Sequence, residues 1–143
     1  MKLTVIIDKL HEEEVVIYAH EKNGLVMHIE QIVLEHRCQI IGYKNKECVK
    51  LNADEIFCFT IQGNKIFALT RDEKYLIKQR LYQIEEKYGN SFIKINQSCL
   101  ASISKISKFD VSVSGTIKIV LKNGYTDYVS RRNLKKVKER LGI

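Results

Sequence analysis

The chain has 143 residues, of which 45% are hydrophobic and 29% are charged, and it contains no proline. This composition predicts one folded domain, with or without a small appendage, and excludes a disordered chain. No apolar run approaches the roughly 20 residues that a membrane helix needs, and the N-terminal run is too short for a signal peptide, so we expect a cytoplasmic protein.

The net charge of +7 is concentrated in the last third of the chain. Residues 1–52 contain seven Lys or Arg and eight Asp or Glu, and residues 53–89 contain six of each kind. Residues 90–143 contain eleven basic and three acidic residues. A local excess of this kind indicates a polyanionic partner, either nucleic acid or an anionic membrane surface.

The residue types that build catalytic and metal sites are scattered along the chain. The four cysteines lack the C-x-x-C spacing of zinc and redox sites, so we expect buried thiols. The four histidines lack metal-binding spacing, and the chain has no clustered carboxylates, no His-activated nucleophile and no glycine-rich phosphate loop. We therefore predict that the protein is not an enzyme and has no catalytic residues, no metal, no cofactor and no small-molecule substrate.

The predicted elements begin with two β-branched runs, residues 2–8 and 14–19, which have the composition of strands. In residues 21–38, apolar positions at i, i+4, i+7 and i+8 then predict a helix. Together these elements form a predicted N-terminal strand-strand-helix extension, residues 1–45. Its apolar stripe fits a dimer or partner surface, and it fits an extension of the core equally well.

Two hairpins are predicted next, at residues 38–51 and 55–70, because each has two apolar runs around a polar turn. Residues 73–89 then show the spacing of a short helix that ends at a glycine. Strand patterns return after this helix, and Asn123-Gly124 is a strong signal for a tight hairpin. The chain is therefore predicted to be mainly β with short helices, an α+β fold.

The last predicted element is a helix that follows Ser130, a good N-cap residue. Leu134, Val137 and Leu141 lie at i, i+3 and i+7 and form the apolar stripe of this helix. The stripe predicts that one face of the helix packs on the core.

Six of the ten residues 131–140 are basic. Those near the C-terminal end of the helix, such as Lys138 and Arg140, complement the helix dipole. Arg131 and Arg132 lie in the first turn, where the dipole disfavours cations by about 0.3–1 kcal/mol each. Because helix stability does not explain these two arginines, we interpret them as ligands for a phosphate or a guanine edge.

An ordered set of residues in the second half of the chain has the pattern of a known family. The set runs Phe92, Lys94, Asn96-Gln97-Ser98, Leu100, Ile103, Ile106, Leu121, Asn123-Gly124, Val129-Ser130-Arg131-Arg132 and Leu134-Lys135-Lys136. It resembles the LytTR DNA-binding domain, the output module of many bacterial two-component regulators, and the resemblance covers residues 46–143. It implies an elongated, mostly antiparallel β-sheet fold that places loops and strand ends into successive major grooves of DNA.

The resemblance also implies roles for individual residues. By position, the base contacts would be made by Lys65, Gln97 and Arg132, and Gln97 suits an adenine. Phosphates would be held by Lys94, Lys105, Lys108, Ser130, Arg131, Lys135 and Lys136. Three positions depart from the family pattern, since Asn96 stands where His or Ser is common, Gln97 where a basic residue is common and Ser102 where Asn is common.

The number of residues before the LytTR-like part of the chain bears on how the protein is regulated and what it binds. About 45 residues are too few for a receiver domain, so the chain resembles the small stand-alone LytTR regulators. We expect a transcriptional regulator that binds double-stranded DNA as a homodimer on tandem sites, with a possible regulatory partner protein that is membrane-bound in some of these systems. The alternative is a basic peripheral module that binds anionic lipid or an acidic partner.

Overall fold

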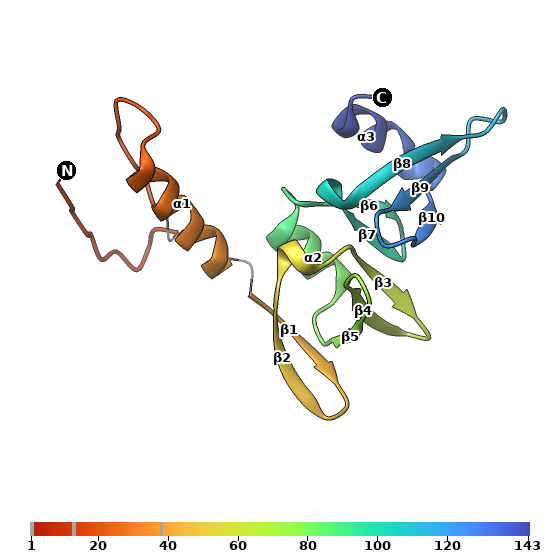
Figure 1. The fold of residues 1–143 in the computed structure, drawn as a ribbon, viewed down its shortest axis with the longest axis horizontal. Helices are drawn as coiled ribbons and strands as arrows, with labels where there is room; N and C mark the ends of the chain where they lie inside the picture. The colour runs from red at the N-terminus through yellow and green to blue at the C-terminus, as the bar shows by residue number, and fades with distance from the viewer. Residues whose placement is uncertain (1, 13, 38) are drawn as a thin grey trace. The chain divides into compact units, whose positions relative to one another are not determined.

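The computed structural model describes residues 2–12, 14–37 and 39–143, and it defines side-chain surroundings outside residues 34–39. It consists of two compact units, residues 1–37 and 38–143 (Figure 1). None of the described helices is both long and apolar enough to cross a bilayer.

The described part of the first unit contains one helix, α1 (Gly24–Arg37), after a long segment without regular structure. The helix predicted here is confirmed, and Asn23 begins it, because the Asn23 Oδ1 accepts a hydrogen bond from the N–H of Val26 at 3.0 Å. The two predicted strands were wrong for the single chain, since the described residues 2–12 and 14–23 contain no strand. Two short strands without a third strand or a covering face are marginal in water.

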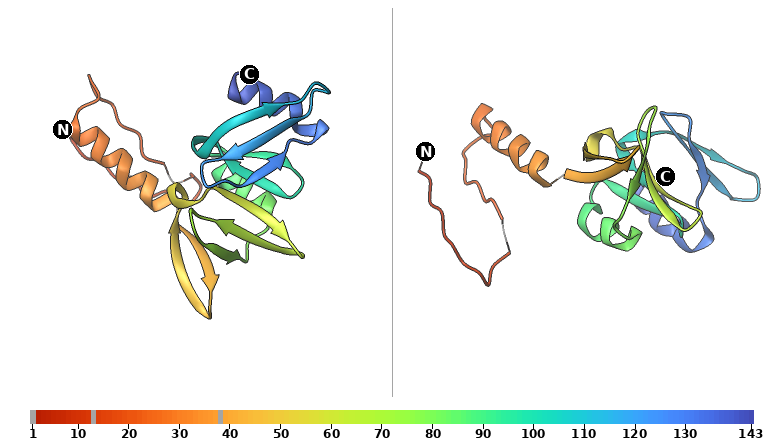
Figure 2. Two further views of the ribbon diagram at one scale, coloured as in Figure 1. Left: turned by 45° about the vertical axis from the view of Figure 1, so that its right-hand side comes forward. Right: turned by 90° about the horizontal axis from the view of Figure 1, so that it is seen from below.

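The second unit is built on a seven-stranded antiparallel sheet with the order β2-β1-β5-β4-β3-β7-β6 (Figure 2). Its strands are β1 (Gln39–Lys44), β2 (Glu47–Asn52), β3 (Cys58–Gln62), β4 (Lys65–Leu69), β5 (Lys74–Ile77), β6 (Phe92–Asn96) and β7 (Cys99–Ser102). The helix α2 (Leu81–Tyr88) lies between β5 and β6 in the chain, and the 3₁₀ turns η1 (Ala53–Glu55) and η2 (Ile103–Lys105) follow β2 and β7.

A smaller three-stranded sheet with the order β10-β9-β8 completes the unit. It consists of β8 (Ile106–Val111), β9 (Ile117–Leu121) and β10 (Thr126–Tyr128), and the C-terminal helix α3 (Arg131–Leu141) follows it. The mainly antiparallel β fold with short helices, predicted from the sequence, is confirmed. The described units divide earlier than residue 45, because β1 pairs with β2 along its whole length and so belongs to the second unit.

The predicted hairpins are formed, and their turns have the expected backbone geometry. Gly63 and Asn64 in the β3–β4 turn both have positive φ angles, 55° and 66°, as a two-residue type I′ turn requires. The β9–β10 hairpin instead has a three-residue loop, in which the N–H of Gly124 binds the carbonyl of Leu121 at 2.9 Å. Gly124 has φ 88°, the position at which such a loop needs a glycine.

The helix predicted for residues 73–89 is shorter in the structure. Residues 74–77 form β5, which pairs with β4 on one side and β1 on the other, and α2 begins only at Leu81. The aromatic and branched side chains of Tyr75 and Ile77 suit a strand, and the neighbouring strands β4 and β1 supply partners for its backbone on both sides.

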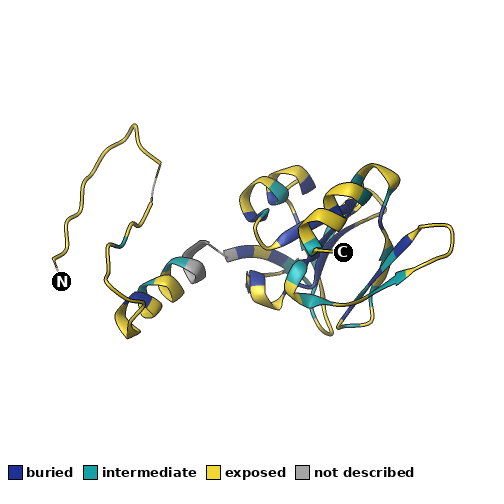
Figure 3. Ribbon diagram, turned by 90° about the horizontal axis from the view of Figure 1, so that it is seen from above, coloured by how far each residue is buried: buried dark blue, intermediate teal, exposed yellow. Residues whose placement is uncertain are grey.

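The core lies on both faces of the large sheet, because neighbouring residues of β3 point to opposite sides. Phe59 packs on Phe92 with ring centroids 5.0 Å apart, in a cluster that α2 covers through Ile84. Cys58 belongs to a second cluster, which α3 covers through Val137. Figure 3 shows buried segments along the strands and in the helices. Packing on both faces of the sheet therefore holds the strands whose ends carry the turns.

Candidate nucleic-acid interface

Two chain reversals lie side by side at one edge of the large sheet. β3 and β7 are antiparallel neighbours in which Thr60 pairs with Cys99, and the N–H of Ile61 binds the carbonyl of Ser98 at 2.9 Å. The β3–β4 turn and the β6–β7 turn therefore end at the same edge. Residues 62–65 continue beyond the last of these pairs and form the projecting tip of the β3–β4 hairpin.

The start of α3 is fixed beside the β6–β7 turn by two hydrogen bonds. The N–H of Ser130 donates to the carbonyl of Ile95 at 2.8 Å, and the Asn96 Nδ2 donates to the carbonyl of Tyr128 at 2.9 Å. The Asn96 Oδ1 also accepts from the N–H of Ser98 at 2.8 Å, which closes the turn around Gln97. We name the three neighbouring segments, residues 62–65, 96–98 and 130–132, the turn edge.

The helix α3 packs by the predicted apolar stripe. Val137 is completely buried, and Leu134 and Leu141 pack on the same cluster, which includes Ile93 and Ile95 of β6. The predicted helix and its stripe are therefore confirmed. This packing turns the opposite, charged face of α3 toward solvent.

Ser130 occupies the N-cap position but makes no side-chain cap bond. Its Oγ instead accepts a hydrogen bond from the Nδ2 of Asn133 at 2.7 Å. Gly142 ends the helix in the left-handed conformation with φ 69°, a common helix C-cap.

The cations at the start of α3 are not neutralised within the described part of the chain. Arg131, Arg132, Lys135 and Lys136 are exposed, and the first turn contains no acidic residue. No ion pair within 4.0 Å in the described residues involves any of the four. Together with the positive end of the helix dipole, they make this surface attractive to anions.

Two further cations, which the sequence pattern did not indicate, lie beside the hairpin tip. Lys65 is exposed there, and a cavity of about 240 Å³ beside it is also lined by Lys78 and Arg80. These residues meet because the end of β5 lies against the start of β4, with Ile66 paired to Ile77. Sequence reasoning missed Lys78 and Arg80 because it placed them inside a helix, although the basic run in residues 78–80 was visible.

Three other predicted phosphate ligands lie apart from this group. Lys94 is on β6, where alternation sends it to the face opposite Ile93 and Ile95. Lys105 lies in η2, at the opposite end of β7 from the β6–β7 turn, with its Nζ 5.2 Å from the ring centroid of Phe57.

Lys108 is on β8, the edge of the small sheet farthest from β10, and its Nζ lies 3.7 Å from Asp110. The turn edge therefore brings together Lys65, Gln97, Ser130, Arg131 and Arg132, with Lys135 and Lys136 on the helix behind them, but not Lys94, Lys105 or Lys108.

A partly buried polar network links the two strands that lead into the turn edge. Tyr125 lies between Thr60 and Asp127, with its hydroxyl 3.2 Å from the Thr60 Oγ1 and donating to the Asp127 Oδ2 at 3.2 Å. Burial raises the pKa of Tyr125, so the phenol stays protonated. The network joins β3 of the large sheet to β10, which leads directly into α3.

The cysteines differ in their surroundings. Cys58 and Cys99 are completely buried as predicted, and a hydrogen bond with Cys58, together with burial, raises the pKa of the Cys99 thiol. Cys48 is exposed, contrary to the prediction, because β2 is an edge strand with one face in solvent. Cys38 lies outside the described residues. Among these residues no three His, Cys, Asp or Glu side chains form a metal-ligand group.

A family model for the LytTr DNA-binding domain matches residues 46–142. The chain belongs to the LytTR family. Relatives from Staphylococcus aureus strains MSSA476 and MW2, both named HTH-type transcriptional regulators, are each 32% identical over 146 residues, covering 100% of this chain and 99% of each relative. The resemblance found in the sequence is thereby confirmed, and the LytTR chain is a DNA-binding regulator.

A solved structure shows the same fold. The LytTr DNA-binding domain of a methyl-accepting/DNA response regulator from Bacillus cereus aligns with a TM-score of 0.70 and 15% identity, covering 74% of this chain and 98% of that one. The names of the Staphylococcus relatives mention a helix-turn-helix. In the described second unit of this LytTR chain, however, both helices are preceded by strands, and α2 is also followed by one. The candidate reading elements are therefore turns and a helix start.

Proposed function

We propose that the turn edge reads double-stranded DNA, with the hairpin tip and the start of α3 entering successive major grooves and the Gln97 turn lying between them. One observation carries this proposal. The hydrogen bonds of Asn96 and Ser130 hold Gln97 directly beside the exposed, unneutralised pair Arg131 and Arg132.

The spacing of the turn edge supports this arrangement. Strands lie about 4.8 Å apart, so the tip between β4 and β3 is roughly 12 Å from β6. The helix α3 packs on one face of β6, about 10 Å out of the plane of the sheet. Because this offset is perpendicular to the first, the backbone span is roughly 16 Å, and long Lys and Arg side chains at both ends extend it toward the repeat of about 34 Å between major grooves on one face of DNA.

The chemistry of the edge assigns roles to its side chains. Arg132 can bind guanine O6 and N7 in a bidentate way, and Gln97 can bind adenine N6 and N7. Lys65 would reach a base or phosphate from the hairpin tip. Arg131, Ser130, Lys135 and Lys136 would hold phosphates, and Lys94 would reach one from the other face of β6. The phosphate contacts of Lys105 and Lys108 stay predictions. They require the bound DNA to extend beyond the turn edge to η2 and β8.

Two copies of the chain would occupy tandem sites as a homodimer, and a regulatory partner protein would control them. The competing function, a peripheral membrane module, requires an apolar helix face for lipid. The apolar face of α3 is packed against the sheet through Val137, so only its charged face remains for binding.

A binding-site selection on random duplex DNA tests the proposal. The wild-type chain should enrich one sequence pattern, and Arg132→Ala should lose the preference at one base pair of it. Lys138→Ala, which removes another exposed cation near the other end of α3, should retain the full pattern. If Arg132→Ala weakens binding equally on every sequence, Arg132 contacts only phosphate and the base-reading role is wrong.

A further inference from the structure

The run of residues 2–8 has the composition of a strand but pairs with nothing in the described part of the chain. Leu3, Val5, Ile6 and Ile7 are between 71% and 87% exposed. Unpaired apolar β-branched segments readily pair with another chain. The run also alternates in character, because Leu3, Val5 and Ile7 fall on one face and Lys2, Thr4, Ile6 and Asp8 on the other.

We propose that residues 2–8 of two copies of the chain pair as antiparallel strands about a two-fold axis at Val5. In this register Lys2 faces Asp8 of the other copy, Leu3 faces Ile7, Thr4 faces Ile6, and Val5 faces itself. The pairing creates two identical ion pairs and places six aliphatic side chains on one face. The inference rests on the homodimer proposed above and adds the surface and register that form it.

Pairing registers shifted by one residue are less favourable than the register centred on Val5. A shift by one residue in one direction places Lys2 opposite Ile7 and removes both ion pairs. A shift in the other direction places Lys2 opposite Lys9 and Leu3 opposite Asp8, which sets like charges and a carboxylate against an apolar side chain. The charges at the two ends of the run therefore select the register centred on Val5.

Local contacts fit the limits of this run. The Oδ1 of Asp8 accepts a hydrogen bond from the N–H of Leu10 at 3.0 Å, which turns the chain and ends the extended segment. The other carboxylate oxygen of Asp8 and the ammonium of Lys2 make no ion pair in the described residues. Both groups are exposed and free to meet a second copy.

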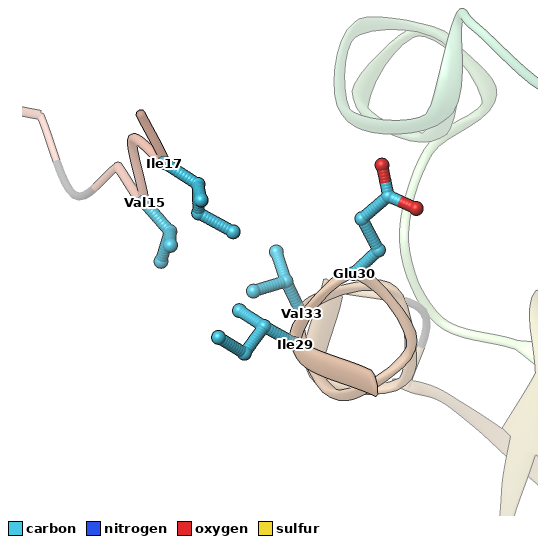
Figure 4. A pocket seen from close by; sticks show the side chains of 5 residues that line it. All are labelled: Val15, Ile17, Ile29, Glu30 and Val33. Atoms are coloured by element: carbon cyan, nitrogen blue, oxygen red, sulfur yellow. The ribbon is translucent and has the colours of Figure 1, made fainter. Parts of the chain in front are cut away.

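The same unit offers an apolar groove for the apolar face of the paired strands. Val15 and Ile17 face Ile29 and Val33 of α1 across a cavity of about 320 Å³ (Figure 4). Glu30 points away from these four side chains in Figure 4, and its carboxylate lies 2.9 Å from the Nζ of Lys22. Four of the five lining residues are therefore aliphatic, and in the proposed dimer this groove would take up the apolar face formed by Leu3, Val5 and Ile7.

The exposed apolar residues of the first unit set the upper limit on the area that a dimer could bury. Its exposed large hydrophobic residues are Leu3, Val5, Ile6, Ile7, Leu10, Val15, Val16, Tyr18, Leu25, Met27 and Ile32. At on the order of 100 Å² for each side chain, these offer about 1,000 Å² per copy. A standard interface needs about 800 Å² per partner.

Sedimentation of the full chain without DNA tests the pairing by a charge swap. The wild type should be a dimer, and Lys2→Glu and Asp8→Lys should each raise the dissociation constant on the order of tenfold, because each sets like charges opposite one another twice. The double variant K2E/D8K should restore the wild-type value. Lys9→Glu, a neighbouring charge outside the pairing, should leave it unchanged.

A thiol introduced at the axis gives a second readout. On mild oxidation the variant Val5→Cys should form a disulfide that joins the two copies at this position, identified by mass spectrometry, whereas Val16→Cys should not link to itself. A monomeric wild type, open-ended aggregates, or a double variant no better than the single ones would overturn the inference. Because sedimentation needs no DNA, these results are separate from DNA reading: a monomer that still selects one DNA sequence refutes the pairing alone.

Discussion

Replacement of Arg132 by alanine should change stability and DNA binding in opposite directions. Arg132 is exposed, has no carboxylate within 4.0 Å among the described residues, and lies in the first turn of α3. Its removal therefore breaks no ion pair and relieves an unfavourable interaction with the helix dipole of about 0.3–1 kcal/mol. For a domain of this size the melting temperature should rise by roughly 1–6 °C.

The same variant should bind its operator more weakly. Loss of a bidentate contact to guanine costs about 1–3 kcal/mol, which is roughly a 5–150-fold increase in the dissociation constant. Calorimetry or thermal melting gives the first quantity, and fluorescence anisotropy with the selected duplex at fixed salt gives the second.

Lys138→Ala is the matched control, because Lys138 is exposed in the last turn of the same helix, where the dipole favours a cation. It should lower the stability slightly and leave the base preference unchanged. If Arg132→Ala instead lowers the melting temperature with no loss of operator affinity, Arg132 is a structural residue and our interpretation of the helix start is wrong.

Three further predictions concern the β6–β7 turn, Tyr125 and the cysteines. Gln97→Ala should lose the preference at one base pair without a change in melting temperature, since the turn is closed by Asn96 and not by the exposed Gln97; a fall in stability would show that Gln97 is structural. Burial raises the pKa of Tyr125 above its ordinary value of 10.0, so the unfolded phenol ionises first and its contribution to stability is lost as pH rises above about 10. Urea titrations at pH 8 to 11 should show that the free energy of unfolding falls less with rising pH in Tyr125→Phe than in the wild type. An equal fall in the two proteins would contradict this role of Tyr125. A thiol reagent at pH 8 followed by mass spectrometry should modify exposed Cys48 before buried Cys58 and Cys99; early modification of Cys99 would contradict the buried hydrogen bond with Cys58.

The elements predicted correctly have strong local signals. Gly63 and Asn64 mark a turn that needs two positive φ angles. The apolar stripe of α3 is recognised from apolar residues spaced three and four positions apart in the sequence. Such signals act within a few residues, so the sequence alone reveals them.

The elements that were missed depend on partners distant in the chain. β5 is a strand because β4 and β1 pair with it on both sides, and helical spacing in the same residues could not show this. The runs 2–8 and 14–19 illustrate the reverse, since strand composition without a partner in the chain gives no strand.

The sequence predicted which residues form the candidate site, but not how these residues are arranged in space. The family pattern implied roles for Gln97 and Arg132, yet their proximity follows from the bonds of Asn96 and Ser130 across more than thirty residues. Lys78 and Arg80 join Lys65 only because β5 lies beside β4.

Nuclear magnetic resonance of the ¹⁵N-labelled chain, titrated with its selected duplex, tests most directly whether the turn edge reads DNA. The largest amide shifts should fall in residues 62–65, 96–98 and 130–136. Shifts concentrated instead in η2 and β8, or in the C-terminal half of α3, would contradict the proposed interface.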